Sequence, residues 1–293
     1  MFLRVVPTVL ACVAAACAVA RPAAAQTPAP ERSATQQKLH QSKTFMPALG
    51  VDLSTRNEQR LARRDLVVVD GELTLKSEVK RIGSRGALVL GYLSVGSVES
   101  WRSWFPLLKD YRLDELDGWP GERYADVSKP EARDALADEI APQLLAKGFD
   151  GLFLDNLDMI EDHAPQQPGM LDLVTRLAAR VHGKGGVLMA QNADTVIDPF
   201  VPLLDAWNRE DPTGTYDFAK KRYVPTDTAG RRLARSTIAR LRGAGLLVTT
   251  TDYFGSPTSA QAKRAVRIAC QVGAVPFVGD IALARVAKKA PRC

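Results

Sequence analysis

Eight short runs of apolar and β-branched residues, spread between residues 46 and 280, limit the folds open to this chain more than any other feature. A polar loop and a longer helical stretch follow most of these runs, which is typical of a parallel sheet with crossover helices. Eight strands over about 240 residues predict a (β/α)8 TIM barrel. A doubly wound open sheet is the alternative, because strand sequences do not show whether a sheet closes. The runs are MPALGVD (46–52), LVVVD (66–70), ALVLGYLS (87–94), GLFLD (151–155), GVLMAQN (186–192), LDAWN (204–208), LLVTTTDY (246–253) and AVPFVGD (274–280).

Four helical stretches are clear between these runs, and several end at a glycine suited to a helix C-terminus. One carries the arginine-rich segment 230–245, whose arginines alternate with Leu233, Ile238 and Leu241. This spacing indicates an amphipathic helix with a solvated basic face. A formal net charge of +6 on 293 residues is mild, so no nucleic-acid partner is expected. The four expected helices are 130–147, 170–182, 229–242 and 259–272.

The first 25 residues have the pattern of a secretory signal peptide: Arg4, an apolar run at 5–20 and three alanines at 23–25. The run is too short and alanine-rich for a membrane span, so we expect a secreted or periplasmic protein without stable membrane insertion. Residues 26–42 lack apolar periodicity and predict a disordered tether. Residues 43–293 are then expected to form a single, monomeric TIM-barrel catalytic domain with a C-terminal tail.

Polar residues recur where the predicted strands end. In a TIM barrel the carboxyl ends of the strands meet at one face, where active sites are built. Several carboxylates around one mouth are unfavourable unless they bind a cation, share protons or divide acid and base roles. The strand-end residues are Asp52, Asp70, Ser94, Asp155, Asn192, Glu210, Asp252 with Tyr253, and Asp280.

Metal and serine chemistry fit this chain poorly. Its histidines are His40, His163 and His182, with no pair at zinc-ligand spacing, so zinc hydrolysis is poorly supported. We expect no metal and no other cofactor. Ser94 is a poor nucleophile candidate, because Tyr92 occupies the position where a nucleophile elbow needs glycine.

Carboxylates and aromatic residues remain, and together they suit a glycosidase. One carboxylic acid protonates the leaving oxygen, while a second carboxylate attacks the sugar or activates water. Aromatic rings near the strand ends can form platforms for sugars. These aromatic residues are Tyr92, Trp101, Trp104, Trp119, Trp207 and Tyr253.

Four segments, in order, give a more specific indication: GYLSVGSVESWRSWF, WPGERYADV, GFDGLFLDNLDM and LDAWNRE. They resemble glycoside hydrolase family 114, the endo-α-1,4-polygalactosaminidase family, over about residues 66–280. The resemblance implies a (β/α)8 barrel that cleaves internal α-1,4 linkages of galactosamine-containing polysaccharide without a metal cofactor. It places the nucleophile on Asp155 and the acid/base on Glu210. The expected substrate-contacting residues are Asp70, Tyr92, Glu99, Asp158, Asn192, Trp207, Asp252 and Tyr253.

The outcome of the reaction depends on the separation of Asp155 and Glu210. They lie on alternate strands, so their backbones are about 10 Å apart. Their carboxylates could then be about 5 Å apart, as retention of configuration needs, or 7 Å or more, as inversion needs. The residues leave this open, and the resemblance favours retention. A catalytically inactive, polysaccharide-binding barrel of the cell envelope is the alternative function.

Two further expectations concern charge and cysteines. The cleft should be acidic and suit a cationic amino-sugar polysaccharide. Removal of the signal peptide would leave Cys270 and Cys293 as the remaining cysteines in an oxidising compartment, so we expect them to form a disulfide. The acids expected to converge on the cleft are Asp70, Asp155, Asp158, Glu210, Asp211, Asp252 and Asp280.

Overall fold

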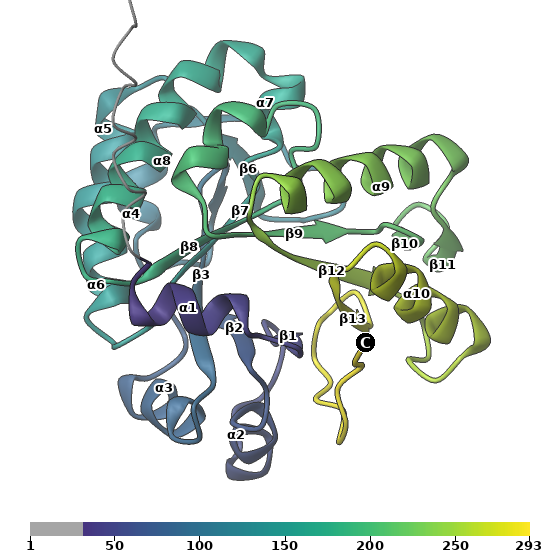
Figure 1. Cartoon of the computed structure of the whole chain (residues 1–293). Coiled ribbons are helices and arrows are strands. Elements are labelled where there is room, and N and C mark those ends of the chain that lie inside the picture. The colour runs from purple at the N-terminus through teal and green to yellow at the C-terminus, as the bar shows by residue number, and fades with distance from the viewer. Residues whose placement is uncertain (1–31) are drawn as a thin grey trace, which may run out of the picture. The chain divides into compact units, whose positions relative to one another are not determined.

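The computed structural model describes residues 32–293, in which eight parallel strands form a nearly closed barrel (Figure 1). The signal peptide and residues 26–31 of the expected tether lie outside the described residues. Each of the eight predicted runs overlaps a barrel strand, so the (β/α)8 prediction is confirmed. The strands are β1 (Phe45–Pro47), β2 (Leu66–Asp70), β3 (Leu88–Ser94), β7 (Gly151–Asp155), β8 (Val187–Gln191), β9 (Ala206–Glu210), β12 (Leu247–Tyr253) and β13 (Val275–Gly279).

The order of the strands rules out the doubly wound alternative. Around the barrel they follow the order of the chain, whereas a doubly wound sheet reverses direction at a switch point. Within residues 32–293, no backbone ladder joins β1 to β13. These two strands meet through the rings of Phe45 and Phe277, which pack edge to face with centroids 6.5 Å apart.

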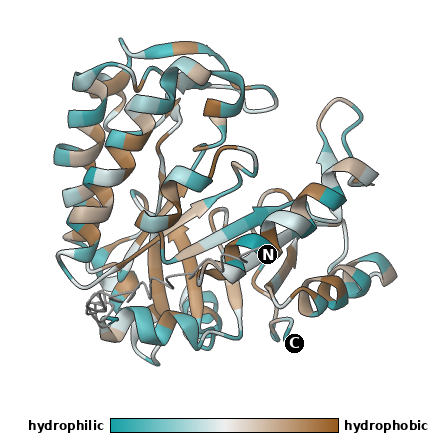
Figure 2. Ribbon diagram, turned by 45° about the horizontal axis from the view of Figure 1, so that its top comes forward, coloured by the Kyte–Doolittle hydropathy of each residue, from teal (hydrophilic) through white to brown (hydrophobic). Residues whose placement is uncertain are grey.

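The strands are apolar because both of their faces are covered. In β2, residues Leu66, Val67, Val68 and Val69 are fully buried, as expected for a parallel strand between a barrel interior and a layer of helices. Figure 2 shows these central strands mainly in brown, while the surrounding helices carry teal residues. β1 ends earlier than predicted, so Asp52 lies in the loop beyond it and is exposed.

The crossover helices follow the predicted pattern, and all four expected helices are present. α9 is amphipathic, as predicted: Thr237, Ile238 and Leu241 are buried while its arginines face outward. No helix among residues 32–293 is long and apolar enough to cross a membrane. The crossover helices are α2 (Thr55–Leu61), α3 (Lys76–Gly83), α5 (Pro130–Asp134) continuing through the π-helix η1 (Ala135–Ile140) into α6 (Ala141–Leu145), α8 (Gln167–His182), the 3-10 helix η3 (Asp198–Leu203), α9 (Thr228–Gly243) and α10 (Ala260–Gln271).

The expectation of a disordered tether at 26–42 is wrong for its second half. Residues Ala34–His40 form helix α1. Ser33 and Gln36 form a reciprocal capping box at its start, which supplies partners for backbone N–H groups that the helix leaves free. Leu39 is fully buried in the main core. Hydrogen bonds from Ser33 to the carbonyl of Gly185 and from Gln36 to Asp205 also tie this helix to the barrel, so tertiary contacts order a segment that lacks apolar periodicity.

Additional short elements lie in the loops that follow barrel strands, and the sequence analysis did not predict them. The loop after β3 contains a three-stranded antiparallel sheet, and the loop after β9 contains a hairpin. Both insertions occur in connections at the carboxyl ends of barrel strands. The additional elements are β4 (Ser97–Glu99), β5 (Arg112–Glu115) and β6 (Glu122–Ala125), the hairpin β10 (Gly214–Asp217) and β11 (Arg222–Pro225), and the short helices α4 (Phe105–Leu108), α7 (Met159–Asp162) and η2 (Ala164–Gln166).

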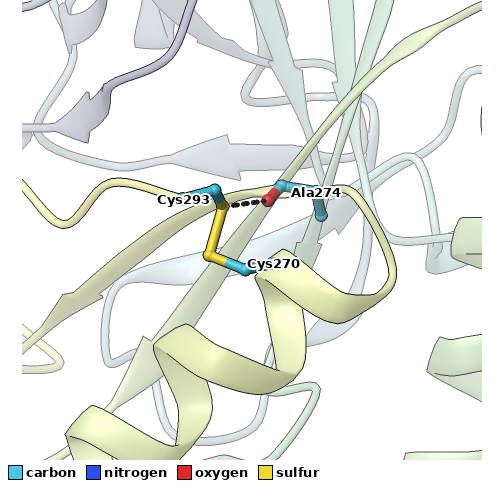
Figure 3. Close-up of a disulfide and its surroundings, with 3 residues drawn as sticks. All are labelled: Cys270, Ala274 and Cys293. Carbon is cyan, nitrogen blue, oxygen red and sulfur yellow. Dashed lines mark hydrogen bonds between the residues drawn. A yellow bond between two sulfur atoms is a disulfide. The ribbon is translucent and has the colours of Figure 1, made fainter.

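The C-terminal tail is fastened by the predicted disulfide between Cys270 and Cys293 (Figure 3). Cys270 lies in the last turn of α10, and the two Cα atoms are 5.2 Å apart. Sγ of Cys293 also lies 3.5 Å from the carbonyl oxygen of Ala274. A disulfide sulfur carries no hydrogen, so this is a contact rather than a hydrogen bond. The prediction that these cysteines pair is confirmed.

Candidate active site

A cleft of about 570 Å³ opens at the carboxyl ends of the barrel strands. The side chains lining it include seven carboxylic acids, and Arg102 is the one cationic residue among them. An acidic cleft in a chain of net charge +6 agrees with the expectation from sequence. The seven acids are Asp70, Glu99, Asp117, Glu122, Asp155, Asp158 and Glu210.

Asp155 and Glu210 meet at the centre of this cleft through a single amide. Nε2 of Gln191, at the end of β8, donates to Oδ1 of Asp155 and to Oε2 of Glu210, with both distances 2.8 Å. Because one nitrogen lies 2.8 Å from each oxygen, those two oxygens are at most twice 2.8 Å, or 5.6 Å, apart. Their separation therefore agrees with the shorter distance considered from sequence, the one that retention of configuration needs.

A buried relay fixes the orientation of the Gln191 amide. Oε1 of Gln191 accepts a hydrogen bond of 2.7 Å from Nδ2 of Asn208. Oδ1 of Asn208 in turn accepts from the hydroxyls of Thr249 and Thr251, at 2.7 and 3.1 Å. Since the carbonyl side of Gln191 is occupied by a donor, its NH₂ group is directed at the two carboxylates. Neither Gln191 nor Asn208 was identified from the sequence.

Each carboxylate also accepts a hydrogen bond from a tyrosine. The hydroxyl of Tyr92 donates to Oδ2 of Asp155 at 2.8 Å, and the hydroxyl of Tyr253 donates to Oε1 of Glu210. Burial and the adjacent carboxylates raise both tyrosine pKa values well above 10, so each phenol keeps its proton at neutral pH. Tyr92 and Tyr253 therefore lie in the cleft, as predicted.

Burial raises the pKa of both carboxyl groups. Burial, followed by the charges of Asp155 and Asp211, raises the pKa of Glu210 to about 8. Burial also raises the pKa of Asp155, but hydrogen bonds from Tyr92, Gln191 and its neighbouring backbone N–H oppose that rise. Two carboxyls this close favour a state in which one holds a proton. The charge of Asp155, which raises the pKa of Glu210, favours Glu210 as the group that holds it.

Left-handed residues turn the chain sharply after the three strands that carry these side chains. Asn156, Asn192 and Asp211 follow β7, β8 and β9 directly, with φ of 59°, 55° and 55°. Asn and Asp adopt this conformation more readily than most residues. Such positions concentrate at functional sites, where the surrounding fold holds them in place. Asn192 also donates from Nδ2 to Oε2 of Glu210 at 3.1 Å, so it lies in the site as predicted.

Arg102 engages two of the predicted substrate-contacting acids. It forms two hydrogen bonds with Glu99, of 2.7 and 2.9 Å, and its Nη1 lies 2.7 and 2.9 Å from the oxygens of Asp70. Its guanidinium also lies over the rings of Tyr92 and Trp104. Asp70 and Glu99 therefore line the cleft while holding Arg102, which the sequence analysis did not single out.

A second polar cluster occupies the side of the cleft near β4. The hydroxyls of Ser94 and Ser97 lie 2.7 Å apart, and Ser97 donates to Glu122 at 2.9 Å. Nδ2 of Asn156 donates to both serines. Burial and the charge of Glu99 raise the pKa of Glu122 to about 7. Ser94 thus belongs to a hydrogen-bonded network, in keeping with its rejection as a nucleophile.

Asp158 and two tryptophans complete the cleft wall. Burial and the charge of Asp155 raise the pKa of Asp158 to about 7. Trp101 and Trp119 line the cleft from the loop after β3, with exposed fractions of 54% and 43%. Exposed rings beside buried carboxyls are typical of a surface that binds sugars.

Two predicted substrate-contacting residues lie elsewhere. Trp207 is fully buried, and its Nε1 donates to the carbonyl of Asn192 at 2.6 Å, so it supports the site from behind. Asp252 is also buried, and its Oδ1 accepts from Thr213 and from the backbone N–H of Gly214. Successive side chains of a strand point to opposite faces of the sheet. Asn208 and Tyr253 therefore face the barrel interior, whereas their neighbours Trp207 and Asp252 face away from it.

Two of the other acids expected in the cleft are also used elsewhere. Asp211 accepts from the hydroxyl of Thr215 at 2.7 Å. Asp280 pairs with Arg285, whose Nε lies 3.1 Å from Oδ2 of Asp280. Neither Asp211 nor Asp280 lines the cleft.

Comparison with known proteins places this site in a family. Residues 23–287 match the model of glycoside-hydrolase family GH114. An uncharacterized protein of Deinococcus radiodurans is 31% identical over 265 residues, which cover 83% of each chain.

Two solved structures share the fold. The glycoside hydrolase domain of PelA from Pseudomonas aeruginosa has a TM-score of 0.71 and 22% identity, over 84% of this chain and 96% of that domain. Aspergillus fumigatus Ega3, solved in complex with galactosamine, has a TM-score of 0.68 and 20% identity, over 92% of this chain and all of that one. Identities this low show likeness of fold alone. Because the family model matches most of this chain, residues 23–287, the chain belongs to glycoside-hydrolase family GH114.

Proposed function

We propose that this glycoside hydrolase cleaves internal α-1,4 linkages of galactosamine-containing polysaccharide, with Asp155 as nucleophile and Glu210 as acid/base. The observation that carries the proposal is the Gln191 amide bridging both carboxylates, which limits the separation of the bridged oxygens to 5.6 Å. Retaining glycosidases hold their two carboxyl groups about 5–5.5 Å apart, whereas inverting enzymes need about 6.5–9.5 Å to admit a water. The geometry supports retention.

The two steps use the protonation states described above. Oδ of ionised Asp155 attacks the anomeric carbon, and Glu210 gives its proton to the departing glycosidic oxygen, which leaves as the hydroxyl of the released chain. A water then attacks the same carbon, and Glu210 accepts a proton from it. The bond to Asp155 breaks, so both groups return to their starting states. The tyrosine and amide donors hold the carboxylates in place throughout.

The substrate class follows from the charge of the cleft. Seven acids and one arginine line it, and this balance attracts a polymer that carries free ammonium groups. Trp101 and Trp119 offer rings on which successive sugars can stack. Ega3, which shares the fold, was solved with galactosamine. A polymer of galactosamine residues that are at least partly deacetylated fits these features, and its binding should weaken with salt.

We also propose that the mature protein is secreted or periplasmic, where such a polymer would be encountered. The signal-like pattern of residues 1–25 supports this. Mass spectrometry of the exported protein should find an N-terminus near Gln26, and an intact Met1 would contradict the proposal.

The function is tested by incubating the purified protein with partially deacetylated α-1,4-galactosaminan. Reducing ends should increase while the polymer shortens to oligosaccharides, because internal bonds are cut. Asp155→Asn should abolish this release. Asp150→Asn is the matched control, since Asp150 is a partly buried aspartate just before the same strand that accepts from the backbone N–H of Val89 outside the cleft. Binding of the polymer without new reducing ends would instead support the polysaccharide-binding alternative.

A further inference from the structure

A second cavity, of about 680 Å³, lies at the seam between the first and last barrel strands. Within the described chain no helix follows β13, so the outer surface of β1 and β13 lacks the helix that an eighth βα unit would supply. The irregular tail after residue 280 and helix α10 cover this seam instead, as the yellow-green end of the chain in Figure 1 shows. No lining residue is shared with the catalytic cleft.

The cavity has an apolar interior. Phe45 and Met46 of β1 and Phe277 of β13 contribute to its wall, together with Val266 of α10 and Val286 of the tail. The tail forms a fixed wall, because its end is covalently joined to α10. A volume of this size is within the range of roughly 300–1,000 Å³ that small-molecule sites occupy.

The polar residues around this cavity are almost all cationic. Six lysines and arginines line it against a single acid, Asp280, which is already paired with Arg285. Five of them are exposed and form a basic rim, whereas one is buried and brings its charge to the interior. The six cations are Arg64, Lys263, Arg267, Arg285, Lys289 and Arg292.

Arg64 is the most unusual of these cations, because it is buried, with 7% of its surface exposed. One Nη donates to the carbonyl of Ala287 in the tail, but Nε has no partner among residues 32–293. Burial, followed by the charge of Arg292, lowers the pKa of Arg64, so its positive charge is poorly compensated. A buried guanidinium normally has a carboxylate or phosphate partner. The position therefore favours an anionic ligand.

We propose that this cavity binds a fatty acid, whose carboxylate pairs with Arg64 while its alkyl chain lies against Phe45, Met46 and Phe277. The basic rim disfavours cationic amphiphiles, and the apolar interior suits an alkyl chain. The site is independent of the hydrolytic cleft.

Isothermal titration calorimetry with decanoate tests this proposal, at concentrations below those at which it forms micelles. Decanoate should bind with a stoichiometry of one. Decyltrimethylammonium has a similar alkyl chain but a positive head, so it loses the charge-assisted hydrogen bonds to Arg64. Acetate keeps the carboxylate but has no long chain to bury. Each should therefore bind at least about tenfold more weakly than decanoate.

Two variants locate the site. Arg64→Met should weaken decanoate binding at least about tenfold, whereas Arg63→Met, a change in the exposed neighbouring arginine, should leave it unchanged. Val266→Trp should weaken binding by filling the cavity while leaving Arg64 intact. Thermal unfolding of each variant checks that it is folded.

Three results would overturn the proposal. The first is an absence of decanoate binding, and the second is equal affinity for decyltrimethylammonium. The third is that the protein forms a concentration-dependent dimer that decanoate does not dissociate but Val266→Trp does. Such a result would show that a second copy of the chain, rather than a fatty acid, covers the cavity.

Discussion

Replacing Gln191 with methionine removes the amide that, among residues 32–293, donates to both carboxylates, while keeping the length of the side chain. The amide lowers the pKa of Asp155 by donating to its ionised form. A hydrogen bond to a charged group contributes about 1.5–3 kcal/mol, and one pKa unit corresponds to about 1.4 kcal/mol. Losing it should therefore raise the pKa of Asp155 by about one to two units.

The sign of the effect on catalysis follows from the proposed role of Asp155 as nucleophile, which requires its carboxylate to be ionised. A higher pKa moves the acid limb of the kcat/KM profile to higher pH by about one to two units, so activity below that limb falls about tenfold to a hundredfold. Glu210 loses a donor to its carboxylate as well, so the basic limb should not move to lower pH.

The assay is the pH dependence of kcat/KM for a soluble galactosamine oligosaccharide. Gln166→Met is the matched control, because Gln166 is also buried and donates to an aspartate, Asp126, outside the cleft. It should leave both limbs in place. An acid limb that does not move in Gln191→Met would refute the role given to the bridging amide.

Three further predictions follow from the same structure. Asp155→Asn and Glu210→Gln should each lower kcat by at least about a hundredfold while polymer binding is largely retained. Asp158→Asn should lower kcat by less. Near-normal cleavage by the first two variants would contradict the proposed catalytic roles of Asp155 and Glu210. The raised pKa values of Glu210, about 8, and Asp158, about 7, mean that the folded state binds more protons than the unfolded state above about pH 4. The free energy of unfolding should thus fall as pH rises from about 4 to 8 in urea titrations, and Glu210→Gln should flatten this slope. Replacing Cys270 and Cys293 with serine should cost about 3 kcal/mol of unfolding free energy in the chain-entropy model, and two free thiols in the mature, unreduced protein would show that they do not pair.

The barrel could be predicted because parallel strands are buried on both faces and therefore read as continuous apolar runs. The same property limits what the strand ends reveal. Adjacent residues point to opposite sides, and the sequence does not say which of the two faces the barrel interior. Asn208 rather than Trp207, and Tyr253 rather than Asp252, face inward, so one member of each pair was misassigned.

The polar relay was missed for a related reason. Gln191 and Asn208 gain their importance from neighbours on other strands, and strand registers are set by the pairing of strands around the barrel rather than by local sequence. Arg102 lies in a loop, where spacing carries little structural information. The capping residues Ser33 and Gln36 were readable in the sequence and would have predicted helix α1.

Asp155 and Glu210 are held at a separation that suits a double displacement, and the configuration of the first product tests this most directly. Proton NMR, recorded during cleavage of an α-1,4-galactosamine oligosaccharide, resolves the anomeric protons of newly formed reducing ends before they equilibrate in water. Two displacements at the same carbon should release the α-anomer first, followed by slow appearance of the β-anomer. Initial release of the β-anomer would show a single displacement by water and contradict the role of Asp155 as nucleophile.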